Sequence, residues 1–348
     1  MSIIRNLGSQ WAATVYVGAI SMLLTFLFGR FLGPEVFGNY NYLLTLGALV
    51  AIFQDGGFRT LIFRERTSPT FQRLKDKLVS IAIGHILVVT MAGMVLVVIL
   101  PFSSWYLLIL TIASFGLGTI TAFYSAQIKG EGRFSDEARW RILVRHLTAG
   151  SILIFIFIFT PAIQWILIGG IVGYVVALAL KPRECSLKPK FQKLDSSVYK
   201  SVTALLIIDV STAIYFKIDI IMLRHLGNGL EEVGFYAASS RLMEGLVFFH
   251  LPFATVLFRE MSLRADNSSQ FISFIQKLLA WSCLPPLVIV PLGWVFSKEI
   301  LSLCYGADFL IGAPILNLLL IAFFFMMPNL VLTQGALAVN LESYYAKI

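Results

Sequence analysis

Apolar stretches of about 20 residues recur along this chain, with short polar segments between them, and that is the length a helix needs to cross a bilayer. The short alternating segments typical of a membrane β-barrel are absent from the sequence. The composition agrees, since 58% of the 348 residues are hydrophobic and the mean hydropathy is +0.83. We therefore predict an all-α, polytopic membrane protein.

Ten stretches can be placed as transmembrane helices. The predicted spans are Gln10–Leu32, Asn41–Phe58, Leu78–Leu100, Ser104–Tyr124, Ile142–Thr160, Ala162–Leu180, Ser201–Leu223, Gly234–Phe258, Leu278–Phe296 and Leu310–Val331. Pro101 and Pro161 end the third and fifth spans. Prolines inside the last two spans would either let these helices bend or fix their packing.

The seventh span, Ser201–Leu223, differs from the others because it carries three charges inside its apolar run. A charge at the centre of a membrane helix costs about 2.5–3.5 kcal/mol on insertion scales. Helical spacing places Asp209 and Asp219 on one face and Lys217 on an adjoining face. We predict that this span forms the wall of a polar pathway.

The positions of Lys and Arg predict the orientation of the chain. If the N-terminus is cytoplasmic, the segments on that side hold 22 Lys and Arg residues, whereas those on the other side hold three. Cytoplasmic loops carry such an excess, so the net charge of +8 does not require a nucleic-acid partner. The inner segments, which we predict to be loops, include Phe58–Lys77, Gln127–Arg145, Lys181–Lys200 and Arg259–Lys277.

A short motif occurs twice, once after the first span and once after the seventh. Residues 32–40 read LGPEVFGNY and residues 226–236 read LGNGLEEVGFY. Six helices separate the copies, so the two halves would share one orientation, as in parallel-repeat transporters. We predict a six-helix N-terminal bundle over residues 1–200 and an incomplete bundle of helices 7 to 10 over residues 201–348, with each motif forming a tight turn.

LGPEVFGNY, after a first span with Asn6 and Gln10 near its start, resembles the polysaccharide-biosynthesis flippase family. This family contains the Wzx-like exporters of O-antigen and capsule repeat units, and it belongs with MATE transporters to the MOP superfamily. DIIML at 219–223 with VGFY at 233–236 is similar to the family's helix 7–8 pattern. YGADF at 305–309 with APIL at 313–316 resembles its helix 9–10 connection, so the resemblance covers essentially the whole chain.

The resemblance implies a flippase that moves polyprenyl-diphosphate-linked oligosaccharides across the bacterial inner membrane by alternating access. The implied partners are the lipid-linked oligosaccharide, membrane lipids, a polysaccharide polymerase and a chain-length regulator. No cofactor is implied, although H⁺ or Na⁺ could be the coupling ion. Family members usually have twelve or more helices, so the resemblance also predicts a C-terminally truncated chain.

Charged residues within or beside the spans are the candidates for chemistry. Arg30, Lys217 and Arg241 are predicted to bind the diphosphate and glycan, because Arg and Lys donate to phosphate oxygens. The carboxylates that could couple transport to an ion, or form structural ion pairs instead, are Asp209, Asp219 and Glu244. Asp219 could pair with Arg241, and Asp55 could pair with Arg59 four residues later.

No catalytic or metal-binding motif is visible, so we do not expect an enzyme. The histidines are scattered at His85, His146, His225 and His250, and the cysteines at Cys185, Cys283 and Cys304 match no metal or redox spacing. Alternatives to the flippase are a MATE-like cation or drug antiporter, a membrane polymerase or ligase, and an inactive truncated remnant. Carboxylates would dominate the cavity of the antiporter, and a polymerase or ligase would carry a large external loop.

Overall fold

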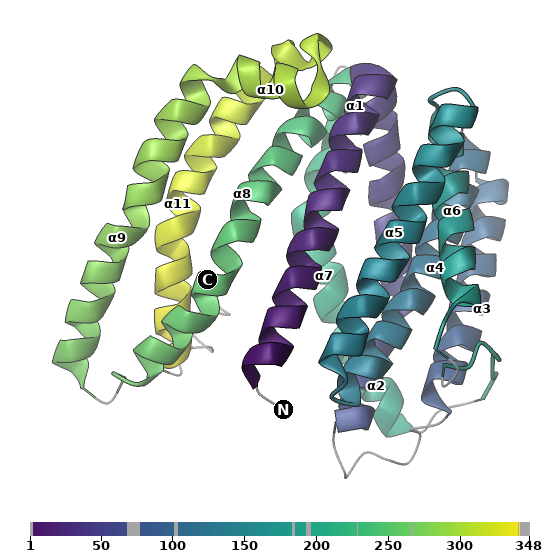
Figure 1. The fold of residues 1–348 in the computed structure, drawn as a ribbon, viewed down its shortest axis with the longest axis horizontal. Coiled ribbons are helices and arrows are strands. Elements are labelled where there is room, and N and C mark those ends of the chain that lie inside the picture. Colours follow the sequence, from purple (N-terminus) through teal and green to yellow (C-terminus); the bar gives the residue numbers. More distant parts are fainter. Residues whose placement is uncertain are drawn as a thin grey trace. The chain divides into compact units, whose positions relative to one another are not determined.

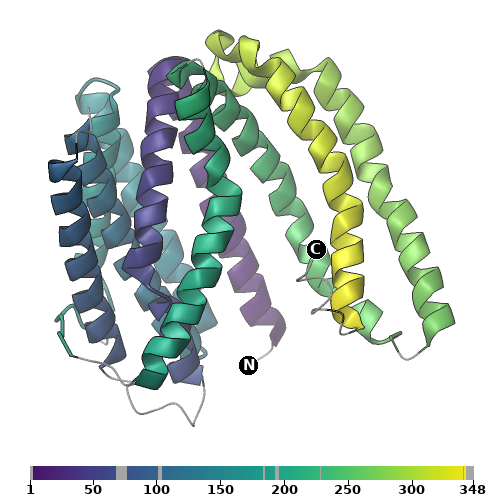
Figure 2. The same ribbon diagram turned by 180° about the vertical axis from the view of Figure 1, so that it is seen from behind.

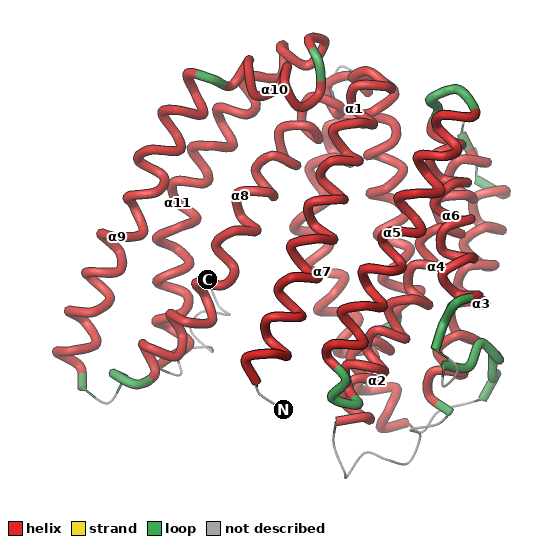
Figure 3. Tube along the Cα trace, viewed as in Figure 1, coloured by secondary structure: helices red, strands yellow, loops and turns green. Residues whose placement is uncertain are grey.

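The computed structural model describes residues 3–67, 77–100, 104–182, 185–192, 196–227, 229–265, 267–339 and 341, apart from some side chains within these ranges. Helices and short turns build this part of the chain, and it contains no strand (Figure 3). The contacts divide the chain into two compact units. Unit 1 comprises Met1–Thr25 and Asn39–Leu230, and unit 2 comprises Phe26–Gly38 and Glu231–Ile348.

The first helix, α1 (Ile3–Asp55), contains both of the first two predicted spans. Gly33 interrupts it with a φ of 68° and a ψ of 171°, a conformation that only glycine adopts easily. The chain reverses direction within α1 (Figures 1 and 2). α1 therefore consists of two arms joined at a tip, which agrees with the tight turn predicted from the first copy of the motif.

Unit 1 holds the arms of α1 and six further helices. They are α2 (Phe58–Thr67), α3 (Leu78–Ile99), α4 (Trp105–Gly130), α5 (Phe134–Ile158), α6 (Ile163–Ala179) and α7 (Ser196–Leu226). In Figures 1 and 2, α3 to α6 lie side by side. α5 and α6 approach closely, because a side-chain carbon added at Gly169 of α6 would lie only 2.8 Å from the Cα atom of Ile152 in α5.

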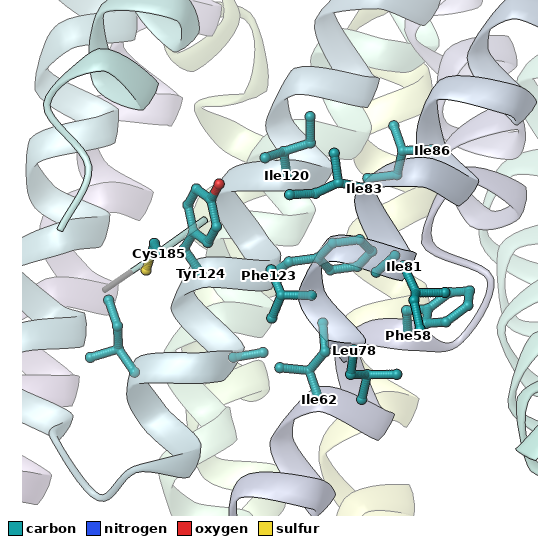
Figure 4. Close-up of a cluster of buried hydrophobic side chains, with 14 of the residues drawn as sticks. Phe58, Ile62, Leu78, Ile81, Ile83, Ile86, Ile120, Phe123, Tyr124 and Cys185 are labelled. Carbon is teal, nitrogen blue, oxygen red and sulfur yellow. The ribbon is translucent and has the colours of Figure 1, made fainter. Parts of the chain in front are cut away.

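A large apolar core holds α2, α3 and α4 together. Figure 4 shows Phe123 of α4, which is fully buried, among side chains that come from the other two helices. Cys185 and Tyr124 lie at one side of this core, and both are buried. The polar segment that follows α6 therefore packs against unit 1, and the amide of Lys190 donates to the carbonyl of Ser80 at 2.9 Å.

Unit 2 contains the tip of α1 and the C-terminal helices. These are α8 (Leu230–Ser262), α9 (Ser268–Val295), α10 (Ser297–Tyr305), the short 3-10 helix η2 (Ala307–Gly312) and α11 (Ala313–Ala338). α9 continues through Pro285, Pro286 and Pro291, and α11 continues through Pro328.

Parts of all three motifs that carry the family resemblance meet inside unit 2, although DIIML at 219–223 belongs to unit 1. Four buried aromatic rings contact one another with centroids 5.2–6.1 Å apart, and they are Phe37 from the tip, Phe235 from α8, Tyr305 from α10 and Phe309 from η2. Gly234 lies so close to Pro34 that an added side-chain carbon would overlap the Pro34 carbonyl group. The two copies of the repeated motif therefore pack directly against each other.

Each of the ten predicted spans falls largely within a helix. Six helices in the described part of the chain are long and apolar enough to cross a membrane, and α6 is a shorter apolar helix. The chain is therefore a multi-pass membrane protein. The described parts of α7 and α8 are not among those six, so the count of ten spans and their division into six and four remain predictions.

The four inner segments that were expected to be loops are all partly helical, since α7 begins at Ser196 and α9 at Ser268. Residues 58–67 form α2, and α5 begins at Phe134 instead of Ile142. Apolar runs locate a span but not the polar turns that extend its helix, because backbone hydrogen bonds continue where the apolar side chains stop. The compact units also do not divide at residue 200, since α7 belongs to unit 1 and the α1 tip belongs to unit 2.

The contact between the two motif copies generates the first prediction. Gly234→Ala should lower the stability of the protein by about 1–3 kcal/mol, because its new methyl group has to displace the backbone at Pro34. Gly150→Ala is the matched control, since no atom lies within 4 Å of a carbon added there. Thermal unfolding in detergent measures both, and equal midpoints for the two variants would contradict the close packing.

Candidate functional site

Unit 1 contains three cavities that share walls. The largest, which we call the basic cavity, has a volume of about 620 Å³, and its cationic lining residues are Arg59, Lys129, Arg141 and Arg145. The tyrosine cavity has a volume of about 380 Å³ and is lined by Tyr40 and Tyr174. The carboxylate cavity has a volume of about 330 Å³ and is lined by Asp55 and Asp209. Ala122 lines all three, so α4 is their common wall.

α4 leaves room for these cavities because small side chains recur along one of its faces. Ser114, Gly118, Ala122 and Ser125 are three or four residues apart, which places them on one side of a helix. A side-chain carbon added at Gly118 would lie 3.2 Å from the hydroxyl of Tyr174. Glycine at this position therefore allows the tyrosine ring to approach the wall.

A buried carboxylate organises the wall of the basic cavity. Glu137, near the start of α5, is only 1% exposed. It accepts hydrogen bonds from the Gln10 amide and the Ser125 hydroxyl, and it forms an ion pair with Arg141 at 2.9 Å. Because an unpaired buried charge is costly, these three partners explain how a carboxylate can be retained here.

Arg145 lies one helical turn after Arg141 and lines both the basic and the tyrosine cavities. Its Nε atom is buried and has no hydrogen-bond partner among the described residues. No carboxylate of the described part of the chain pairs with it, and the one carboxylate of the basic cavity, Glu137, pairs with Arg141. Arg145 therefore contributes to both cavities a positive charge that no described carboxylate pairs with.

The carboxylate cavity contains two of the charges predicted in the seventh span. Asp209 and Lys217 of α7 line it together with Asp55 and Arg59. Asp219 is not part of its lining, and the Asp219 carboxylate accepts a hydrogen bond from the backbone amide of Ile220 at 2.8 Å. The prediction that α7 forms the wall of a polar space therefore holds for Asp209 and Lys217.

A break in the backbone brings Asp55 and Arg59 to this cavity. Gly56 and Gly57 have positive φ values of 53° and 78° and separate α1 from α2. The two residues lie on either side of the break and line the same cavity, so any pairing between them does not run along one continuous helix, and the pairing stays a prediction. His85 of α3 packs against Gly56, and its Nε2 atom donates to the carbonyl of Phe53 at 2.8 Å.

Three of the predicted site residues lie in unit 2. Arg30 donates to the backbone carbonyls of Leu303 and Cys304, so it caps the last turn of α10. Burial raises the pKa of the Cys304 thiol and keeps it neutral, although Arg30 acts in the opposite direction. Arg241 and Glu244 form an ion pair at 2.7 Å, as their spacing predicts.

The predicted pairing of Asp219 with Arg241 would join the two units, and it stays a prediction. Roles in substrate binding for Arg30, Lys217 and Arg241 also stay predictions. To bind a ligand with all of its donors, Arg30 would have to break its hydrogen bonds to the carbonyls of α10. Arg241 would have to bind the ligand while it also pairs with Glu244.

Sequence reasoning missed the basic cavity because its charges lie at or near the ends of the predicted apolar spans. Lys129, Arg141 and Arg145 were counted as loop residues that set the orientation. The signal that could have revealed them is the spacing of Glu137, Arg141 and Arg145, which places all three on one helical face. The small residues of α4 provide a second signal, since such a face leaves space beside it.

The histidines make separate contacts. Tyr16 and His146 are hydrogen-bonded, with rings that stack 5.8 Å apart, and Tyr42 lies 3.3 Å from His225. The side chain of His250 lies outside the described residues. Among the residues that the structure describes, no group of three or more His, Cys, Asp or Glu side chains could hold a metal ion.

Comparisons with known proteins give the family and the fold. The sequence profile of a family described as polysaccharide biosynthesis protein matches residues 3–262. A mutant of the Vibrio cholerae MATE transporter VcmN has 16% identity and a TM-score of 0.56, and the alignment covers 96% of this chain and 83% of that one. Among curated proteins, a sequence search finds no match.

Two further structures have the same fold. An inward-facing multidrug resistance transporter of the MATE family is 13% identical with a TM-score of 0.56, and the alignment covers 97% of this chain and 84% of that chain. A MOP superfamily transporter from Pyrococcus furiosus is 12% identical with a TM-score of 0.51, and the alignment covers 96% and 82%. Its binding pocket is described as having reverse polarity, suggesting a different function.

The buried carboxylate generates the second prediction. Glu137→Ala should lower the free energy of unfolding by about 3–5 kcal/mol, because Arg141 would lose its buried counter-ion. Asp136→Ala is the control, because this neighbour is 43% exposed and its ion pairs are worth less than about 1 kcal/mol. Denaturant unfolding in detergent measures the difference, and similar losses for both variants would rule out the organising role of Glu137.

Proposed function

Because the chain belongs to the polysaccharide biosynthesis protein family and has the fold of MOP superfamily transporters, we propose that it is a flippase for lipid-linked oligosaccharides. The substrate would be an oligosaccharide repeat unit on polyprenyl diphosphate, destined for O-antigen, capsule or another surface polysaccharide. The membrane would be the bacterial inner membrane, with the N-terminus in the cytoplasm. The excess of Lys and Arg in the inner segments supports this orientation.

The basic cavity carries this proposal. Four cationic side chains line it, against a single carboxylate that Arg141 already neutralises. A diphosphate supplies the missing negative charge, and guanidinium groups bind phosphate oxygens through paired, charge-assisted hydrogen bonds. Arg145 is best suited to this contact because its Nε atom has no partner in the described part of the chain.

The tyrosine cavity would take the sugars next to the diphosphate. It continues from the basic cavity, since Arg145, Thr148 and Tyr174 line both. Hydroxyl groups and aromatic rings in its lining offer hydrogen bonds and flat apolar surfaces to a sugar ring. The polyprenyl chain would remain in the bilayer while the head group crosses the membrane by alternating access.

A second candidate function is a MATE-like antiporter for cations or drugs. The carboxylate cavity favours it, because Asp55 and Asp209 line one space and could bind a cation. Arg59 and Lys217 line the same space and compensate the two carboxylates. In the flippase this cavity would instead bind the coupling ion, either H⁺ or Na⁺.

An export assay tests the basic cavity. Arg145→Ala should reduce surface polysaccharide roughly 10–100-fold in cells that depend on this protein, because a hydrogen bond to a charged group is worth about 1.5–3 kcal/mol. Arg139→Ala is the control on the same helix, since Arg139 is 83% exposed and does not line the cavity. Full export by Arg145→Ala at normal expression would remove the basic cavity from the pathway.

The residues predicted from the sequence can be tested in the same assay. Arg30→Ala, Lys217→Ala and Arg241→Ala should each lower export if they form a second part of the head-group pathway. Detergent-solubilised stability must be measured alongside, because Arg30→Ala also removes the cap of α10. Unchanged export for all three variants would exclude this patch and leave the basic cavity as the proposed site.

A further inference from the structure

Arg141 differs from its neighbour Arg145 in that its two Nη groups donate hydrogen bonds to the protein, and its Nε atom lies in an ion pair although it makes no hydrogen bond among the described residues. Its Nε atom pairs with Glu137 at 2.9 Å, and its Nη1 atom donates to the Thr14 hydroxyl at 3.1 Å. Its Nη2 atom donates to the side-chain oxygen of Gln10 at 3.2 Å and lies 3.4 Å from the Gln10 carbonyl. A ligand in the basic cavity can therefore bind Arg141 only by replacing some of these partners.

The partners that would be replaced lie on the first arm of α1. Three polar side chains join residues 8–25 to α5. Gln10 contacts Phe134, Glu137 and Arg141. Thr14 contacts Arg141, and Tyr16 contacts His146. Within this arm, only Ala13 and Leu24 are buried among the described side chains. Hydrogen bonds, with little apolar burial, therefore contribute much of what holds the arm to α5.

We propose that Arg141 is a latch between α1 and α5 that an anionic head group opens. This inference rests on the proposed function, because the diphosphate of the substrate is the anion concerned. Binding draws the two Nη groups of Arg141 away from Thr14 and Gln10, while Nε stays paired with Glu137. The first arm of α1 then loses its polar contacts with Arg141 when the substrate occupies the cavity.

Arg141 should exchange Thr14 and Gln10 for the diphosphate, because its hydrogen bonds to the diphosphate would be stronger than those to the protein. Thr14 and Gln10 offer neutral oxygen atoms, whereas a diphosphate offers charged ones. Hydrogen bonds between ionised partners are roughly twice as strong as those between neutral partners. Glu137 keeps its place because Gln10 and Ser125 also donate to it, so Arg141 turns about a fixed ion pair.

Because the ligand competes with Thr14 and Gln10 for Arg141, removing one of these protein partners should raise the affinity for an anionic ligand. Thr14→Val removes one acceptor of Arg141 and should make the purified protein bind inorganic pyrophosphate roughly 2–10-fold more tightly, since one such hydrogen bond is worth about 0.5–1.5 kcal/mol. Arg141→Ala should weaken binding. Thr25→Val is the matched control, because Thr25 makes the same bond to its own helix, 2.8 Å to Ser21, and makes no side-chain hydrogen bond to a described residue of α5.

Opening of the latch can be measured directly by pulsed electron–electron double resonance between two spin labels. Spin labels at Val15→Cys and Leu143→Cys, which are 50% and 37% exposed, report the distance between α1 and α5 once the native cysteines are replaced by Ala or Ser. Pyrophosphate should lengthen this distance. Labels at Val95→Cys in α3 and Ile154→Cys in α5 should show no change.

The outcomes distinguish failure of the Arg141 latch from failure of the proposed anion site in the basic cavity. Wild-type protein that does not bind pyrophosphate would overturn the anion site and the latch together. Binding without a longer α1–α5 distance, or binding that Thr14→Val does not strengthen, would overturn the latch alone. A purely structural role for Arg141 predicts unchanged or weaker binding for Thr14→Val, so a tighter complex supports the latch.

Discussion

The ion pair between Glu137 and Arg141 is the interaction on which unit 1 depends most directly. A carboxylate that is 1% exposed inside a membrane bundle has to be neutralised, and its partners come from α1, α4 and α5. Because Arg141 neutralises Glu137, the lining of the basic cavity holds no further carboxylate to neutralise Lys129 and Arg145. The same pair therefore stabilises the bundle and leaves an excess of positive charge facing an open space.

Much of the fold follows from the distribution of apolar residues, because a bilayer imposes the length of each span. The helical character of each predicted span, the turn at Gly33 and the charges of α7 that line a cavity could all be predicted. Helix ends could not, since polar residues such as those from Phe134 to Arg141 continue α5 without any apolar signal. The basic cavity was missed for that reason, as its arginines lie at or near the ends of the predicted apolar spans.

The repeated motif has a role that its sequence alone could not define. A copy of a turn predicts a turn, but only the folded chain shows that the two copies pack on each other at Pro34 and Gly234. Aromatic residues from all three motifs complete this contact in unit 2. Most of the residues that carried the family resemblance therefore build a packing centre, whereas Gln10 and Tyr40 belong to the candidate site in unit 1.

The position of the α1 tip also affects how the protein can be divided. The chain passes between the two units at residues 25–26, 38–39 and 230–231, because the tip belongs to unit 2 and its arms belong to unit 1. No single cut separates the chain into two self-sufficient fragments. A chimera that exchanges unit 2 between related proteins must also transfer residues 26–38, or the donated helices will lack Phe37 and the Arg30 cap.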